Sequence, residues 1–118
     1  MIYEDEYIII EQEQNKLPWI KIFSKKKYKE LSECDEETRK RLFDVMLIVE
    51  KAMLDFYKPE KINIASFGNI YPFVHIHVIA RFKEDDYFPE SMWGQKQRES
   101  ELKLPSFDEF CKKLIKLL

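Results

Sequence analysis

The chain has 118 residues, the size of a single domain with one hydrophobic core, so residues 1–118 are expected to form one domain. Hydrophobic residues make up 45% of it, and nine Phe, six Tyr and two Trp favour a packed globule over disorder. A net charge of −2 argues against a nucleic-acid partner, the lack of a long apolar run argues against a membrane span, and two cysteines without a disulfide framework favour the cytoplasm.

The first part of the chain predicts two strands. Residues 6–11 and residues 19–24 are rich in β-branched and aromatic side chains. In the second of these runs, Trp19 and Lys21 fall on the same face because side chains alternate along a strand. The lysines at positions 25–27 are interpreted as a solvated strand end rather than as a phosphate-binding track.

The middle of the chain predicts helical structure. Residues 27–31 predict one helical turn, and Asp35 then offers an N-cap for a longer helix. Pro59 disfavours helical conformation at the residue before it, so this helix is expected to end near Tyr57. Its apolar stripe recurs at helical spacing and consists of Leu42, Met46, Val49, Met53 and Phe56.

Two more strands and a short helix complete the prediction. Strands are expected over residues 61–67 and 73–82, and residues 87–104 are expected to be irregular. Ser106 and Glu109 form a capping box that opens a short helix. The inward side chains of that helix are expected to be Phe110, Leu114 and Ile115. This order of elements predicts an α+β fold with an antiparallel sheet.

The only two histidines of the chain, His75 and His77, are one residue apart in the last of these strands. The alternate positions are apolar, as on the core side of a half-buried strand: Val74, Ile76, Val78, Ala80 and Phe82. Both imidazoles therefore share the opposite face, with their Cα atoms roughly 6–7 Å apart. A side chain that titrates near neutrality, repeated on a rigid element, suits catalysis or metal binding.

Three interpretations of this pair are open from the pattern alone. The histidines can be solvated on the outer face of a sheet. They can be two ligands of a metal ion, although a zinc site needs a third ligand and neither Cys34 nor Cys111 stands at a ligand spacing. They can also act as a nucleophile and a general acid or base.

The sequence around the pair resembles the signature of the histidine triad (HIT) superfamily of nucleotide hydrolases and transferases. The family pattern is His-φ-His-φ-His-φ-φ, with φ apolar, preceded by a Gly and an amide residue. It aligns with residues 73–79 and with Gly68 and Asn69. Further matching positions extend the resemblance over almost the whole chain and include Leu17, Pro18, Trp19, Leu31, Asp85, Asp86, Pro89, Trp93 and Gly94. The resemblance implies a HIT-like fold, with an antiparallel sheet of about five strands, one long helix and a short C-terminal helix, in a homodimer.

The first triad position is Phe73 in this chain, so a dyad stands where the family has a triad. The resemblance implies that His75 is the nucleophile and forms a covalent nucleotidyl-histidine. It also implies that the other nitrogen of that ring donates to the backbone carbonyl of residue 73, which needs no particular side chain. His77 corresponds to the residue that contacts the phosphate and the bridging oxygen and, when protonated, can stabilise charge or protonate a leaving group.

A second departure concerns the substrate. Many purine phosphoramidases of the superfamily have Ser or Thr two residues after the loop Gly, where this chain has Ile70. The expected function is therefore cleavage of a nucleotidyl α-phosphate bond in a phosphoanhydride, such as a dinucleoside polyphosphate like diadenosine tetraphosphate or a related purine nucleotide. No cofactor is required by the protein, and Mg²⁺ can accompany a polyphosphate substrate. The alternative is a nucleotide-binding HIT-like protein with little or no turnover.

The resemblance also implies a set of substrate-binding residues. Gly68 and Asn69 match the loop that approaches the phosphate, and Asn63 matches another polar position around it. Glu11 matches the acidic residue that holds the ribose hydroxyls. From sequence alone, a turn-forming Asn69 and a surface carboxylate at Glu11 are equally open interpretations.

Overall fold

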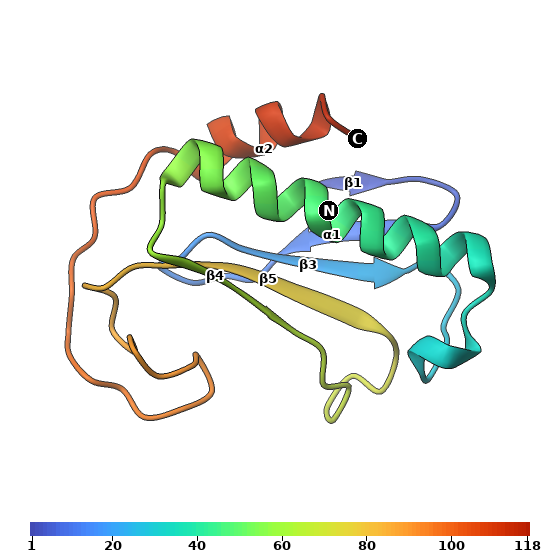
Figure 1. Cartoon of the computed structure of the whole chain (residues 1–118), viewed down its shortest axis with the longest axis horizontal. Coiled ribbons are helices and arrows are strands. Elements are labelled where there is room, and N and C mark those ends of the chain that lie inside the picture. Colours follow the sequence, from blue (N-terminus) through green and yellow to red (C-terminus); the bar gives the residue numbers. More distant parts are fainter.

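Five antiparallel strands form one sheet in the computed structural model, which describes residues 1–118 (Figure 1). In chain order they are β1 (Tyr3–Glu4), β2 (Ile8–Gln12), β3 (Trp19–Ser24), β4 (Lys61–Ala65) and β5 (His75–Arg81). Their order across the sheet is β1-β2-β3-β5-β4, so β5 lies inside the sheet and β4 forms one edge. The predicted α+β class with about five antiparallel strands is confirmed.

The helical elements are the 3-10 turn η1 (Leu31–Glu33), the long helix α1 (Glu36–Tyr57) and the short helix α2 (Phe107–Ile115). The Asp35 side chain caps α1 by accepting a hydrogen bond from the backbone N–H of Thr38 at 3.0 Å. At the other end, Lys58 adopts a left-handed conformation with φ of 49°, directly before Pro59. Both predicted ends of the long helix are confirmed.

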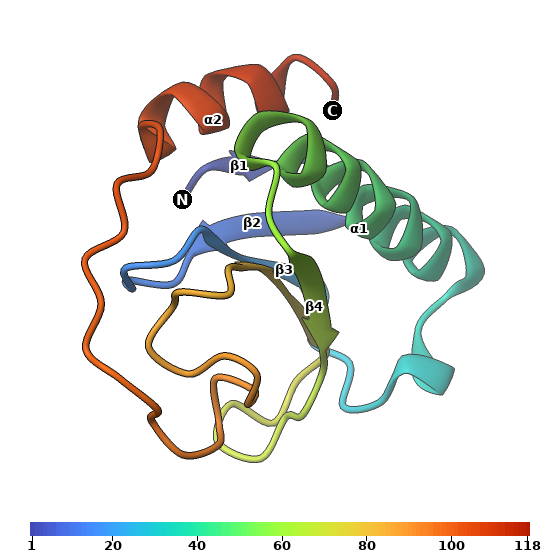
Figure 2. The same ribbon diagram turned by 60° about the vertical axis from the view of Figure 1, so that its left-hand side comes forward.

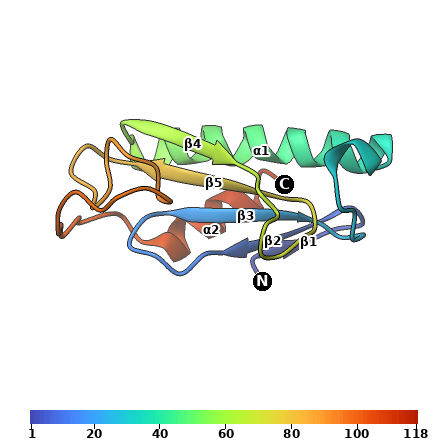
Figure 3. The same ribbon diagram turned by 90° about the horizontal axis from the view of Figure 1, so that it is seen from below.

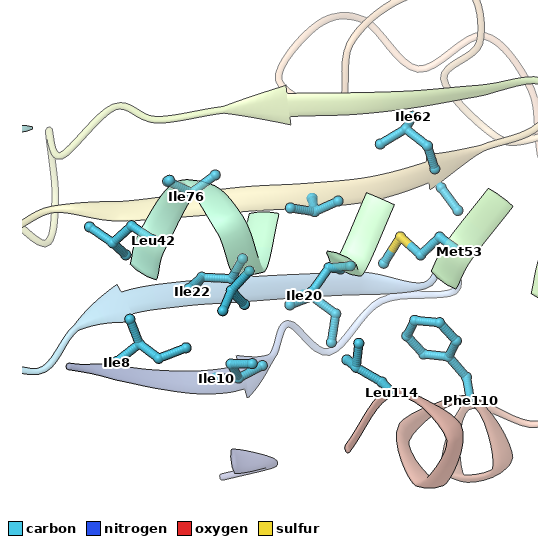
Figure 4. Close-up of a cluster of buried hydrophobic side chains, with 14 of the residues drawn as sticks. Ile8, Ile10, Ile20, Ile22, Leu42, Met53, Ile62, Ile76, Phe110 and Leu114 are labelled. Atoms are coloured by element: carbon cyan, nitrogen blue, oxygen red, sulfur yellow. The ribbon is translucent and has the colours of Figure 1, made fainter. Parts of the chain in front are cut away.

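Both helices cover the same face of the sheet, and the hydrophobic core lies between them and the strands (Figure 3). Figure 4 shows isoleucines of β2, β3 and β5 pointing toward side chains of α1 and α2. The fully buried members include Ile8, Ile10, Ile20, Ile22, Leu42, Val45, Val49, Met53, Phe110 and Leu114. Burying each large side chain contributes roughly 1.5–3 kcal/mol. This burial determines which side chains of each central strand face the helices, because a shift of one residue would expose them.

Several predicted details differ from the structure. The helical turn expected at residues 27–31 is η1, one turn later, and the strand expected at residues 61–67 ends at Ala65. On α1 the buried stripe uses Val45, while Met46 is only partly buried. Ile115 is 44% exposed because it lies about 100° around α2 from the buried Leu114.

Two connections lie on the sheet face opposite the helices (Figure 2). One joins β4 to β5 over residues 66–74, and the other runs from β5 to α2 over residues 82–106 without regular structure. Their residues cover the odd-numbered side chains of β5, among them His77, Ile79 and Arg81. Neither helix has the combination of length and hydropathy that a membrane crossing needs.

Candidate active site

His75 and His77 lie on the face of β5 that points away from the helices. The intervening Ile76 and the following Val78 belong to the core, so strand alternation turns both imidazoles to the opposite side, as predicted. Each histidine is only 8% exposed, because aromatic rings of β3 and of the two connections cover them. The interpretation of the pair as solvated residues on an outer face is therefore wrong.

The hydrogen bonds of His75 fix which of its nitrogens carries the hydrogen. Its Nδ1 lies 2.8 Å from the backbone carbonyl oxygen of Phe73. A carbonyl oxygen only accepts, so Nδ1 is the protonated nitrogen and Nε2 of the neutral ring keeps its lone pair. The ring is stacked on Phe23, with centroids 5.1 Å apart, and Tyr71 contacts it edge-on. In its neutral form, His75 thus presents an oriented Nε2 lone pair.

His77 has the opposite arrangement. Its Nδ1 accepts a hydrogen bond of 2.9 Å from the indole Nε1–H of Trp19. An indole nitrogen only donates, so the neutral His77 ring carries its hydrogen on Nε2. Burial above all, together with the neighbouring His75 and Lys21, lowers the pKa of His77 to about 4, against an opposing effect of Glu13. His77 is therefore neutral at pH 7, and the role given to its protonated form in the sequence interpretation does not apply there.

The two imidazoles open into a cavity of about 910 Å³, within the size range of small-molecule sites. Its floor is the sheet face formed by β3 and β5, where Lys21 lies opposite His77 and Phe23 opposite His75. The loop of residues 67–71 forms one wall. The neighbouring strand β2 and the residue after it contribute Ile9, Glu11 and Glu13.

Three of the four predicted substrate-binding residues line this cavity: Glu11, Gly68 and Asn69. Gly68 has a φ of +77°, a conformation that side chains other than that of glycine disfavour. Asn69 does not have a positive φ. The alternative interpretation, that an Asn stands here because it tolerates an unusual turn conformation, therefore loses its basis.

Asn63, the fourth predicted residue, does not line the cavity. It lies in β4, and its Oδ1 accepts a hydrogen bond of 2.7 Å from Nη1 of Arg81. This arrangement gives Asn63 a role in holding the Arg81 guanidinium rather than a place at the ligand.

Three lysines line the cavity. Lys21, Lys25 and Lys27 all line it, which places two lysines of the predicted solvated strand end at the site. Lys21 forms an ion pair with Glu13 at 3.1 Å and Lys25 with Glu4 at 2.7 Å. The ammonium of Lys27 lies 5.6 Å from the centre of the Phe73 ring. Among the three, Lys27 has no carboxylate partner.

A buried ion pair holds the segment that closes the cavity on the His77 side. Arg81 donates to the two carboxylate oxygens of Asp85 at 2.9 and 3.0 Å, and both side chains are almost inaccessible. Burial raises the pKa of the Asp85 carboxyl, but Arg81 and three backbone N–H groups outweigh this effect and lower it overall. Trp93, eight residues further on, contacts His77 edge-on at 5.1 Å between ring centres.

The metal-binding interpretation finds little support in the arrangement of side chains. No group of three His, Cys, Asp or Glu side chains is placed to hold a metal ion. The Nδ1 atoms of both histidines already have hydrogen-bond partners, which leaves at most the two Nε2 atoms as ligands.

Sequence reasoning missed the aromatic surroundings of the histidines. Trp19, Phe67 and Trp93 each contact His77, and Trp93 also contacts the other two rings, with ring centres between 4.6 and 6.3 Å apart. The shared face of Trp19 and Lys21 was a visible signal, but the contact with His77 depends on the pairing of β3 with β5, which the local pattern does not specify.

Comparison with known proteins agrees with this fold. The family profile described as HIT domain matches residues 1–84, which is more than half of the chain. A solved histidine triad protein from Bradyrhizobium japonicum is 25% identical, with a TM-score of 0.78, over 98% of this chain and 87% of its own. A histidine triad protein from Sinorhizobium meliloti is 24% identical, with a TM-score of 0.77, over 99% and 87%. One from Marinobacter aquaeolei is 22% identical, with a TM-score of 0.74, over 98% and 83%. No curated protein sequence matches the chain. Since the family profile covers most of its length, this protein belongs to the HIT domain family.

Proposed function

We propose that this protein is a nucleotide hydrolase or transferase that cleaves its substrate at the α-phosphorus by way of a nucleotidyl group on His75. Membership of the HIT family supports a nucleotide-related function. The proposed mechanism rests on one observation: the two neighbouring imidazoles are held as opposite tautomers. His75 offers an Nε2 lone pair and His77 offers an Nε2–H in the same cavity.

The first step of the proposed reaction is a displacement at phosphorus. Nε2 of His75 bonds to the α-phosphorus while the bond to the bridging oxygen breaks, and the leaving phosphate departs with the electron pair. The hydrogen on Nδ1 stays on the ring and continues to donate to the Phe73 carbonyl. The Nε2–H of His77 donates to a phosphoryl oxygen and stabilises the charge that develops there.

The second step restores the enzyme. A water molecule attacks the phosphorus, the bond between phosphorus and Nε2 breaks, and the proton of the water leaves to solvent. A nucleoside monophosphate is released, and His75 regains its lone pair. If the hydroxyl of another acceptor replaces the water, the same step transfers the nucleotidyl group.

The neutral state of His77 supports a phosphoanhydride as the substrate. A phosphate leaving group is stable as an anion and needs no proton, whereas an amine leaving group does. A neutral imidazole is a poor acid, and Ile70, which is 99% exposed, brings no hydroxyl to assist. We therefore propose a purine dinucleoside polyphosphate, such as diadenosine tetraphosphate, as the substrate class, with Mg²⁺ bound to its phosphates.

The walls of the cavity support the proposed orientation of the nucleotide. Gly68 and Asn69 adjoin the phosphate, and Glu11 holds the ribose hydroxyls. The lysines at positions 21, 25 and 27 are suited to phosphates beyond the first one.

We also propose that the protein is a cytoplasmic homodimer. Strand β4 is an edge of the sheet, and α1 carries exposed apolar side chains at Phe43, Leu47 and Leu54 that a second copy would cover. Both cysteines are free, which suits a reducing compartment.

A panel of nucleotides tests the proposed function. The protein should hydrolyse dinucleoside polyphosphates faster than nucleoside phosphoramidates, and His75→Ala should abolish turnover while far-UV circular dichroism stays unchanged. Turnover at the wild-type rate in His75→Ala would refute the mechanism. Tight nucleotide binding without turnover in the unaltered protein would instead favour the alternative, a nucleotide-binding protein. That alternative is suggested by Phe73, which replaces the first histidine of the family pattern.

A further inference from the structure

We propose that Trp19 is a positioning residue, whose indole N–H holds His77 as a neutral ring with its hydrogen on Nε2, aimed into the cavity. The effect of Trp19 on catalysis rests on the proposed function, in which His77 donates a hydrogen bond to the substrate. The contact itself is independent of any substrate. Trp19 is 7% exposed, and its Nε1–H donates to Nδ1 of His77 at 2.9 Å.

The position of Trp19 makes this contact a rigid one. Trp19 is the first residue of β3 and pairs with Ile79, so it lies diagonally across from His77, a separation that aromatic side chains bridge. Leu17 and Ile79 pack with it in a small buried cluster. The indole has no other hydrogen-bond acceptor, and a buried indole N–H requires one. The indole N–H of Trp19 and Nδ1 of His77 are therefore each other's only hydrogen-bond partners.

The chemistry of the indole distinguishes this arrangement from a carboxylate partner. A carboxylate accepts from the ring nitrogen of a histidine and favours its protonated form. An indole N–H donates, never accepts and does not titrate near neutrality. Protonation of His77 on Nδ1 would point one N–H at another N–H, so Trp19 opposes the imidazolium and selects the neutral donor.

The charged groups around His77 act in both directions. His75 and Lys21 disfavour a positive charge on His77, while Glu13 favours it and is engaged in an ion pair with Lys21. Burial is the largest effect. Because burial alone does not choose between the two neutral tautomers, the location of the hydrogen on Nε2 is the specific contribution of Trp19.

Nitrogen NMR of ¹⁵N-histidine-labelled protein tests the assignment without a substrate. In the unaltered protein, His77 should show hydrogen on Nε2 only, and it should stay neutral down to about pH 5. Trp19→Phe keeps an aromatic ring but removes the donor, so His77 should become a mixture of tautomers and titrate at least one pH unit higher. Trp93→Phe is the matched control, since Trp93 contacts the same ring by its edge without a hydrogen bond, and it should keep the Nε2–H tautomer.

The kinetic readout separates positioning from binding. Loss of the orienting hydrogen bond should lower kcat about five- to tenfold in Trp19→Phe and leave KM within about twofold. Trp19→Phe with an unchanged tautomer and an unchanged titration of His77 would overturn the proposal. If the unaltered protein turns over no nucleotide but shows the Trp19-dependent tautomer, the proposed function fails and the positioning of His77 by Trp19 stands.

A measurement on the unaltered protein covers the case in which Trp19→Phe does not fold. A scalar coupling across the hydrogen bond, between Nε1 of Trp19 and Nδ1 of His77, should be observed in doubly labelled protein. Its absence, with both resonances assigned, would overturn the proposal.

Discussion

The buried ion pair between Arg81 and Asp85 is expected to dominate the stability of the segment that closes the cavity. Asp85 accepts two hydrogen bonds from Arg81 and further ones from the backbone N–H groups of Phe82, Tyr87 and Phe88. Asp85→Asn keeps the volume of the side chain but leaves the Arg81 guanidinium, 2% exposed, without its counter-charge. Removal of one partner of such a pair costs roughly 3–5 kcal/mol.

That cost is a large part of the total stability of a domain, which is about 5–15 kcal/mol. Urea unfolding followed by circular dichroism should therefore show a lower midpoint for Asp85→Asn, by roughly 2–3 M. Asp44→Asn is the control, since it breaks the exposed pair with Lys40 on α1 and should leave the midpoint nearly unchanged. A loss below about 1 kcal/mol in Asp85→Asn would refute the central role of this pair.

Three further predictions concern His77, metal ions and assembly. The pKa of His77 is 6.5 in the unfolded chain and about 4 in the folded protein, so the unfolded state binds the proton more tightly. The wild type should therefore lose stability as the pH falls from 6.5 to about 4. Urea titrations should show a loss roughly 2–3 kcal/mol larger than in His77→Gln, which lacks this group. Dialysis against a transition-metal chelator, with Mg²⁺ restored, should leave hydrolysis unchanged, and zinc-dependent recovery of activity would contradict this. Leu47→Glu should convert the dimer to a monomer in light scattering, and an unaltered protein that is already monomeric at micromolar concentration would contradict the dimer.

The elements that depend on local chemistry were predictable from the sequence. The Asp35 cap and Pro59 define α1, and the alternation around His75 and His77 defines both the strand and the face that carries them. These features follow from side chains within a few residues of one another. The two-residue strand β1 was not placed, because two residues are too few to show an alternation.

The contacts that define the chemistry of the site were not predictable in the same way. The hydrogen bond from Trp19 to His77 spans 58 positions and depends on the register between β3 and β5. The engagement of Asn63 by Arg81 depends on the neighbouring pair of β4 and β5. Register is fixed by the burial of all strands against α1 and α2 together, so it is a property of the whole core rather than of one segment.

The stereochemistry of hydrolysis tests the covalent route through His75 most directly. A dinucleoside polyphosphate with a chiral α-phosphorothioate is hydrolysed in ¹⁸O-labelled water, and the configuration of the released nucleotide is determined. Two successive in-line displacements, first by His75 Nε2 and then by water, each invert phosphorus, so the account predicts net retention. Net inversion would mean a single attack by water and would contradict the nucleotidyl-histidine.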